Sequence, residues 1–136
     1  MMLPPKPPPY LQELENEWFP HITDSGLERV IELLDKSSPL LIHGAFTRAV
    51  PMGCLATHIA WHHPRTCRWT LEAGIMWLSR VAGLNPATSK MILAWDSSDV
   101  HDLELRANLL EAFKAERQRR QNALGEPQAS NDLVLI

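Results

Sequence analysis

Long apolar runs are missing from this chain of 136 residues. No stretch approaches the roughly 18 consecutive apolar residues that a membrane-spanning helix needs. The opening residues, MMLPPKPPPY, also lack the charged start and the apolar core that define a secretory signal peptide. We therefore expect a soluble protein of the cytoplasm that has no membrane as a partner.

Cysteine is scarce too, with Cys54 and Cys67 as the two in the chain. Two cysteines cannot build the framework of several disulfides that stabilises small secreted domains, and in a reducing compartment both would remain thiols. The chain also has no Cys-x2-Cys pair of the kind that many structural zinc sites contain. These shortages exclude a disulfide scaffold and leave any metal site to single cysteines and histidines.

The length of the chain and its hydrophobic content of 45% suffice for one core and not for two. We predict a proline-rich arm at residues 1–9, a helical domain at residues 10–122 and a C-terminal tail at residues 123–136. The tail ends in four apolar residues, 133–136 (LVLI), which predicts that it docks on its own domain or on another chain.

Charge is distributed unevenly along the chain, although the formal net charge is only -3. Residues 1–43 carry three basic and seven acidic side chains, and residues 96–136 carry five basic and eight acidic ones. Between them, residues 44–95 carry five basic side chains and a single acidic one, Glu72. This layout predicts one of two arrangements. Either the acidic flanks fold against the basic centre and neutralise it, or the centre stays open for an acidic partner.

Apolar residues recur at helical spacing along most of the chain. The pattern predicts an all-α fold, a small single-domain bundle of about five helices with flexible termini. One run, residues 40–43 (LLIH), is typical of a short extended segment. The spacing places helices over residues 10–18, 27–36, 54–63, 71–82, 86–95 and 100–121. Three of the faces expected to be buried are Tyr10, Leu11, Leu14 and Trp18 in the first helix, Leu27, Val30, Ile31 and Leu34 in the second, and Thr88, Met91, Ile92 and Trp95 in the fifth.

Capping residues indicate where several of these helices should begin and end. Ser25 with Glu28 forms a capping-box pattern, and Gly83 stands where a left-handed residue would end a helix. Asn85 followed by a proline predicts a new helix start. Thr70 and Asp99 are the other predicted N-caps, and the predicted buried faces are Leu71, Ile75, Leu78 and Ala82 in one helix and Leu103, Ala107, Leu110 and Phe113 in the last.

Four of the five tryptophans and three of the six histidines lie within residues 53–96, where the core or any site should be built. Trp61, Trp69 and Trp77 recur every eight residues, but Pro64 interrupts the repeat. We therefore interpret the three rings as core anchors from two helices, in preference to a platform on which nucleic-acid bases stack.

Residues 78–92 resemble the helix-turn-helix unit of bacterial repressors of the lactose-repressor type. The resemblance rests on the small residue Ser79, the turn glycine Gly83 and the NPAT sequence at residues 85–88. It implies that Asn85 and Thr88 begin a recognition helix whose first residues enter the major groove of DNA. Ser89 stands where that family has a buried valine or isoleucine. An ordinary pair of well-capped helices accounts for the same residues.

Cysteines and histidines of the central segment have spacings that suit a metal ion. Cys54, His58 and His62 follow one another at intervals of one helical turn, and zinc accepts both residue types. The helix rises about 12 Å over that distance, so an ion would need one neighbouring pair together with Cys67, with His43 or His101 as a further candidate ligand. Ile59 occupies the position where a zinc-protease helix carries its general-base glutamate, which excludes that enzyme class. The alternative is a buried Cys54 beside histidines that bond to carbonyls, and we expect no metal and no other cofactor.

The sequence thus predicts binding without catalysis. A thiol at the start of a helix could be reactive, but no base and orienting group for Cys54 can be recognised. We expect an accessory or adaptor subunit that engages an acidic macromolecule, with a protein as the expected partner and its oligomeric state open. A DNA-binding helix-turn-helix protein is the rival hypothesis, and a small metal-binding domain is the third. The candidate residues are Arg65, Arg68, Arg80 and Lys90 for the partner, with Asn85 and Thr88 added for DNA, and Cys54, His58, His62 and Cys67 for a metal.

Overall fold

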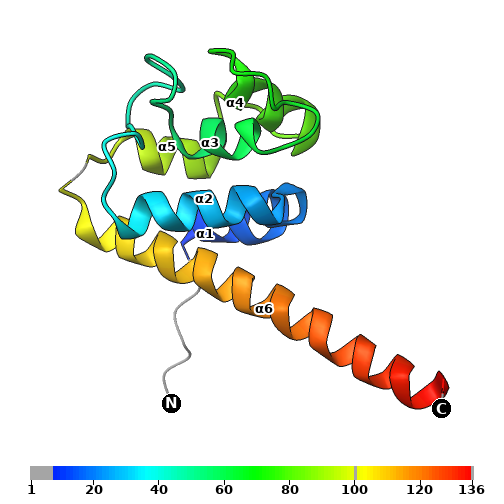
Figure 1. Cartoon of the computed structure of the whole chain (residues 1–136). Helices are drawn as coiled ribbons and strands as arrows, with labels where there is room; N and C mark the ends of the chain where they lie inside the picture. Colours follow the sequence, from blue (N-terminus) through cyan, green and yellow to red (C-terminus); the bar gives the residue numbers. More distant parts are fainter. Residues whose placement is uncertain (1–7, 100, 136) are drawn as a thin grey trace.

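Helices form almost all the regular structure of this protein. The computed structural model describes residues 8–99 and 101–135, with side chains as far as residue 124. It has six α-helices and no β-strand within those residues, which confirms the all-α prediction. Figure 1 shows α2 (Asp24–Asp35) in the middle, between α6 (Leu103–Leu135) and α3 (Leu55–Trp61). No helix in the described part of the chain is both long and apolar enough to cross a membrane.

The N-terminal helical segment begins at a proline. α1 (Pro9–Glu13) uses Pro9 at its first position, where the fixed φ of proline suits a helix and its missing amide hydrogen is not needed. A π-helical turn, η1 (Leu14–Trp18), and a 3-10 turn, η2 (Phe19–His21), continue it. The predicted apolar face is confirmed, because Leu14 and Trp18 are fully buried.

The central helix α2 has the face that its sequence predicts but a different cap. Leu27, Val30, Ile31 and Leu34 are all buried, as the spacing requires. The predicted N-cap Ser25 is wrong, because the Gly26 amide donates to Thr23 Oγ1 at 3.1 Å and the helix begins at Asp24. The Thr23 hydroxyl also donates to the carbonyl of His62, and this tertiary contact favours Thr23 as the cap.

The predicted extended segment at residues 40–43 is a connector that borders Gly53. The Gly53 amide donates to the Leu40 carbonyl at 2.9 Å, and the Ile42 amide donates to the Gly53 carbonyl at 3.0 Å. These two bonds make an isolated bridge between Leu41 and Gly53, too short to count as a strand. They hold the chain in place immediately before α3, whose N-cap is Cys54.

A close crossing of α3 and α4 (Ala73–Met76) determines which side of the following segment is buried. A Cβ atom on Gly74 would lie 2.4 Å from Thr57 Oγ1 and 2.9 Å from the Thr57 amide nitrogen, so only glycine fits. The side of Gly74 therefore faces α3, together with Ala73, Trp77 and Leu78. The predicted face was wrong at Leu71 and Ile75, which are exposed, and α4 begins after Glu72 and not at Thr70.

Two π-helical turns carry tryptophans into the core. η3 (Trp77–Val81) follows α4 directly, and its Trp77 meets Trp18 of η1 edge to face, with ring centroids 5.2 Å apart. Gly83 then adopts a φ of 73°, the left-handed conformation that the sequence predicts after this segment. α5 (Lys90–Asp96) buries Met91, Ile92 and Trp95 as predicted, whereas Thr88 is exposed.

The last helix begins three residues later than predicted and buries a different face. The Leu105 amide donates to Asp102 Oδ1 at 3.0 Å, so Asp102 caps α6, and Asp99 accepts from the His101 amide in the preceding turn. Because the start differs, the buried face runs through Leu105, Leu109 and Phe113. The predicted face was wrong at Leu103 and Ala107, both of which are exposed.

The C-terminal part of α6 extends away from the bundle (Figure 1). Its backbone is helical to Leu135, although the sequence predicts a loop over residues 125–132. Pro127 lacks one amide hydrogen, but such a gap is local, and the residues before Gly125 are good helix formers. The predicted docking of residues 133–136 lies outside the described side chains, as do residues 1–7 of the predicted arm.

Candidate partner-binding surface

The four basic residues proposed for partner binding are exposed. Arg65 and Arg68 lie in the loop between α3 and α4, Arg80 lies in η3, and Lys90 is the first residue of α5. We call these four residues the basic set. Within residues 8–99 and 101–124, no acidic side chain forms a salt bridge with any of them.

Four cations of α6 differ from the basic set because acidic residues pair with them: Lys114, Arg117, Arg119 and Arg120. The acids come from α2, which lies against α6, and from α6 itself. The pairs that join the helices are Lys114 with Asp35 at 3.9 Å, Arg117 with Glu28 at 3.2 Å, and Arg120 with Asp24 at 2.8 Å. Acidic side chains of the N-terminal flank are thus engaged by the C-terminal flank.

One acidic residue of the N-terminal flank does reach the central segment, but it binds backbone amides. Glu13 accepts from the Lys90 amide at 2.9 Å and from the Met91 amide at 3.1 Å. It also accepts from the Ser89 hydroxyl at 2.6 Å and from Trp18 Nε1 at 3.1 Å. A carboxylate therefore closes the N-terminus of α5, where free amides and the helix dipole would otherwise attract an anion.

The residues of the helix-turn-helix resemblance are arranged differently from that family's pattern. Asn85 was predicted to begin the second helix, but its Oδ1 accepts from the Ala87 amide at 2.9 Å in a turn. Ser89 is the actual N-cap, because its hydroxyl accepts from the Ile92 amide at 3.3 Å and donates to Glu13. These two bonds explain why Ser89 stands where the family has an apolar residue. Thr88 lies exposed in the turn, one position before that cap.

The candidate metal ligands are dispersed. Cys54 Sγ is buried and lies 3.7 Å from Thr57 Oγ1, and His58 Nε2 donates to the Leu40 carbonyl at 2.8 Å. His62 and Cys67 are exposed beyond the end of α3, and Cys67 Sγ donates to the Pro64 carbonyl at 3.7 Å. Among the residues that the structure describes, no three His, Cys, Asp or Glu side chains are placed to share an ion.

Burial makes Cys54 unreactive. It raises the pKa of the thiol to about 11, although hydrogen bonds with Thr57 act in the opposite direction. At neutral pH the thiol therefore stays protonated, and the nucleophilic thiolate is not formed. This position does not provide the activated cysteine that covalent catalysis needs.

Burial also lowers the pKa of His58 to about 4, and its bond to the Leu40 carbonyl only partly opposes this. In the unfolded chain, His58 has its ordinary pKa of about 6.5. Between pH 6.5 and pH 4 the unfolded chain therefore binds a proton at His58 that the folded protein does not bind. Neutral His58 makes its full contribution to the free energy of unfolding above pH 6.5. At pH 5 the free energy of unfolding should be lower by about 2 kcal/mol. Urea unfolding at pH 7 and pH 5 measures this loss.

A His58→Gln variant is the control for that measurement, because His62 and His63 also titrate with lowered pKa values through burial. The variant should be less stable at pH 7 but should lose about 2 kcal/mol less than the parent on acidification. An equal loss in both proteins would contradict the role assigned to His58.

A buried cation that the sequence pattern does not indicate lies between α6 and α5. Arg106 is only 7% exposed, and no carboxylate in the described part of the chain pairs with it. Its guanidinium lies 5.7 Å from the centroid of the Trp95 ring, and Nη1 lies 3.5 Å from His43 Nε2. His43 stacks on the same tryptophan, with centroids 3.8 Å apart. A cation–π contact thus takes the place of an ion pair.

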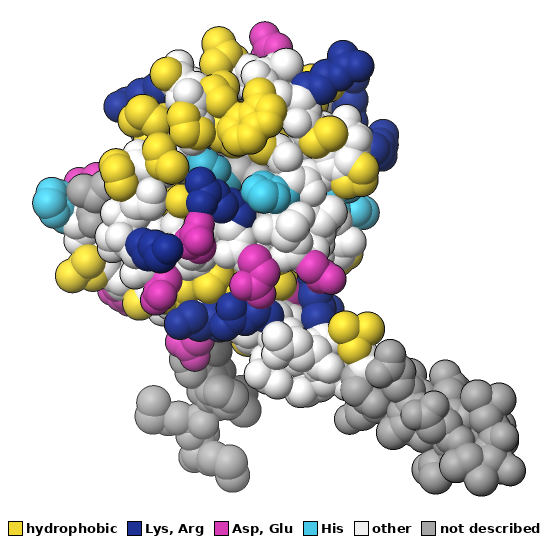
Figure 2. Space-filling view, viewed as in Figure 1, with side chains coloured by type: hydrophobic (Ala, Val, Ile, Leu, Met, Phe, Trp, Pro, Cys, Tyr) yellow, Lys and Arg dark blue, Asp and Glu magenta, His cyan; other side chains and the backbone are white. Residues whose placement is uncertain are grey.

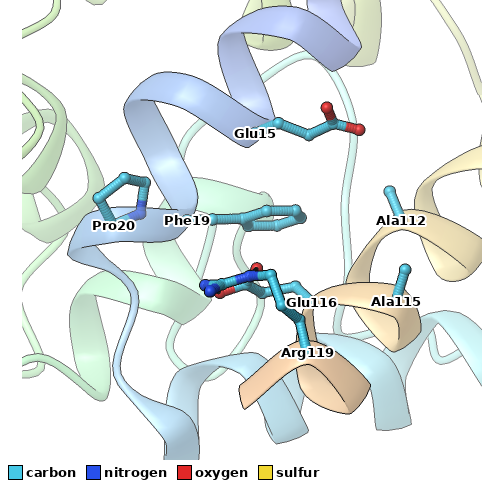
Figure 3. A pocket seen from close by; sticks show the side chains of 7 residues that line it. All are labelled: Glu15, Phe19, Pro20, Ala112, Ala115, Glu116 and Arg119. Carbon is cyan, nitrogen blue, oxygen red and sulfur yellow. Dashed lines mark hydrogen bonds and ion pairs between the residues drawn. The ribbon is translucent and has the colours of Figure 1, made fainter. Parts of the chain in front are cut away.

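A cleft of about 380 Å³ separates the N-terminal segment from α6 (Figure 3). Phe19 and Pro20 line one side, and Ala112 and Ala115 line the other. At its base lies Glu116, which burial alone would make harder to ionise, but hydrogen bonds from two arginines lower its pKa. The two arginines are Arg119 and Arg120, whose contacts with Glu116 measure 2.7 to 2.8 Å. The charges of Glu116 and of these two arginines therefore satisfy one another.

The exposed position of Trp69 is the feature that sequence reasoning missed. Trp61 and Trp77 are buried core anchors as predicted, whereas Trp69 is 62% exposed. The prediction was wrong because Trp69 lies in the loop between α3 and α4, where no helix turns it inwards. Its ring instead stacks on Trp61, with centroids 4.8 Å apart and planes 27° from parallel.

Comparisons with models of protein families, with curated proteins and with solved structures find no match to this chain.

Proposed function

We propose that this protein is a non-catalytic binding domain whose basic set engages an acidic protein partner. The observation that carries the proposal is the contrast between two groups of cations. The cations of α6 that face α2 have acidic partners, whereas the basic set is exposed and has none among the described residues. Unpaired surface cations leave a local positive field that attracts acidic groups and accelerates their association.

A protein partner fits this geometry better than duplex DNA does. Glu13 places a carboxylate at the N-terminus of α5, where it would repel a phosphate group. The side chain of Asn85 is already used in a turn. The formal net charge of the chain is -3, whereas domains that bind nucleic acid through the backbone are usually basic. Arginine, by contrast, is enriched at the centres of protein interfaces.

The absence of catalysis in this proposal is supported by the chemistry of the buried groups. The Cys54 thiol is protonated at neutral pH, and the carboxylate of Glu116 is bound by two arginines. Neither group is free to act as a nucleophile or as a base. An adaptor or accessory role requires only a binding surface, which the basic set provides in this proposal.

Neutralising the basic set should weaken binding to an acidic polypeptide without unfolding the domain. The variant is Arg65→Gln, Arg68→Gln, Arg80→Gln and Lys90→Gln, and the probe is poly-glutamate of defined length. We expect affinity to fall by roughly tenfold or more at about 50 mM salt, because unscreened charge attraction is then largest. Fluorescence anisotropy of labelled poly-glutamate measures the affinity, and thermal unfolding checks the fold.

The matched control removes the same charge from paired positions, through Arg29→Gln, Lys36→Gln, Lys114→Gln and Arg117→Gln. These cations already have acidic partners, so their loss should cost little affinity. Equal weakening in both variants would mean that net charge, and not the basic set, causes binding. Random-sequence duplex DNA is the second probe. A tight complex with a log-log salt slope of about -3 to -4 would favour four phosphate contacts and the DNA hypothesis.

A further inference from the structure

Exposed apolar side chains follow Arg65 and Arg68 of the basic set in the sequence. Trp69 is 62% exposed, Leu71 is 55% exposed, and Ile75 on α4 is exposed as well. We call these three residues the Trp69 surface. Figure 2 shows hydrophobic side chains gathered over the end of the molecule that carries α4, with lysine or arginine side chains on both sides of them. An apolar patch with a polar rim is typical of a protein interface.

The Trp69 ring is held in place before any partner arrives. One face of its indole rests on Trp61, and the other is left to solvent as the exposure requires. A side chain that is already ordered loses little conformational entropy on binding. Tryptophan in such a position is among the residues that contribute most to the affinity of interfaces.

The stack also contains a hydrogen-bond donor that lacks an acceptor. Trp61 Nε1 is buried and has no partner among the described residues. A buried N–H without an acceptor is costly, and groups of this kind usually find one. Because this atom is buried, a partner that packs on Trp69 reaches it only if the surrounding side chains move.

Charge and apolar surface come from one stretch of the chain. Arg65 and Arg68 precede Trp69 by four residues or fewer, and all three are exposed. Leu71 and Ile75 are aliphatic, so they offer no ring on which a nucleic-acid base could stack. Glu72 is the one acidic residue in this stretch, and it lies on the far side of Leu71 from the arginines in sequence.

We infer that the acidic partner is a segment with a large apolar side chain beside its carboxylates, and that this side chain packs on the Trp69 surface while the carboxylates meet Arg65 and Arg68. The inference rests on the proposed function and adds to it the kind of sequence that is recognised. Charge then accounts for attraction and the apolar contact for selectivity. The two contributions differ in their response to salt, because screening weakens the first and not the second.

Two synthetic peptides of equal length and charge test this inference. One combines aspartate and glutamate with glycine and serine, and in the other a phenylalanine and a leucine replace two of the small residues. We expect the second peptide to bind the full chain roughly tenfold more tightly or better, and to keep that advantage at about 500 mM salt. Anisotropy of labelled peptides measures both affinities. Alkylation of the exposed Cys67 gives a second readout, because the second peptide should slow it and buried Cys54 should not react.

The variants Trp69→Ala and Leu71→Ser should abolish the difference in affinity between the two peptides. The salt dependence of the remaining affinity should be unchanged. Leu93→Ser is the matched control, because Leu93 on α5 is 55% exposed, like Leu71, but lies outside the Trp69 surface. Circular dichroism checks that each variant folds.

Three results would overturn the inference. Equal binding of the two peptides, with dependence on the basic set intact, would leave the proposed function standing and remove the apolar contact. If neither peptide binds, both the proposed function and the apolar contact are ruled out. Tighter binding of single-stranded oligothymidine than of both peptides, lost in Trp69→Ala, would instead identify a base-stacking surface.

Discussion

Replacing Gly74 by alanine should destabilise the protein by about 3 kcal/mol, because the new methyl group would have to share space with Thr57. The two short approaches are 2.4 Å to the hydroxyl oxygen and 2.9 Å to the backbone amide nitrogen. The hydroxyl donates to the Phe46 carbonyl at 2.7 Å and could rotate away only by losing that bond, and the amide belongs to α3, so α3 and α4 would have to separate. Alanine would favour the helix itself by at most about 1 kcal/mol, which does not offset the clash. Urea or thermal unfolding measures the net loss.

Two further variants show whether the close crossing is the cause. Ser79→Ala changes an exposed position of the neighbouring η3 turn and should alter stability by about 0.5 kcal/mol or less. Thr57→Ala loses its bond to the Phe46 carbonyl, but combined with Gly74→Ala it should cost less than the sum of the two single changes, because the hydroxyl no longer opposes the new methyl group. A Gly74→Ala protein with the same melting temperature as the parent would show that α3 and α4 leave room for a methyl group at this position.

Replacing Glu13 by glutamine should cost about 3 kcal/mol, because its carboxylate accepts four hydrogen bonds, three of which join α1 to the start of α5. Glutamine has one acceptor oxygen in place of two, and its NH2 group would lie against N–H or O–H groups that are themselves donors. The Ser89 hydroxyl would lose its acceptor, and the charge at the N-terminus of α5 would be gone. Chemical unfolding at neutral pH measures the loss.

The matched control for Glu13 is Glu17→Gln, the same chemical change at an exposed position of η1. It should have an effect of about 0.5 kcal/mol or less. Ser89→Ala combined with Glu13→Gln should destabilise by less than the sum of the single changes, because both remove the same bond. Additive effects, or similar losses for Glu13→Gln and Glu17→Gln, would mean that the network does not hold α5 in place.

Those parts of the fold that depend on one helix were predictable from the sequence. The buried face of α2 follows from the spacing of Leu27, Val30, Ile31 and Leu34, since a twelve-residue amphipathic helix has one way to bury them. The left-handed Gly83 follows from local chemistry as well. Such features need no knowledge of distant residues.

Features set by contacts between distant residues were not predictable. Thr23 replaces Ser25 as a cap because it also binds the carbonyl of His62. Leu71 is exposed because Gly74, and not the apolar stripe, faces α3. Periodicity records which residues are apolar, and it does not record where a second helix approaches most closely.

The candidate surface, too, has features that the sequence predicts and features that depend on contacts between distant residues. The basic charge of residues 44–95 could be counted in the sequence, but whether acidic flanks neutralise it depends on which helices meet. α2 meets α6, so its acids pair with Lys114, Arg117 and Arg120. The position of Trp69 could not be predicted either, because a loop has no period that separates inside from outside.

The two ends of the folded domain are joined to each other, and this has a consequence for how the chain reaches its structure. Arg120 donates to the Phe19 carbonyl across a sequence separation of 101 residues, and Ser89 reaches Glu13 across 76. Phe19 and Phe113 meet edge to face at 5.2 Å. Helical domains usually fold fast because their contacts are local, whereas here a large loop must close before the core is complete. When a ribosome has synthesised the chain only as far as Trp95, α6 has not yet been made, and α2 still lacks the helix that packs against one of its sides.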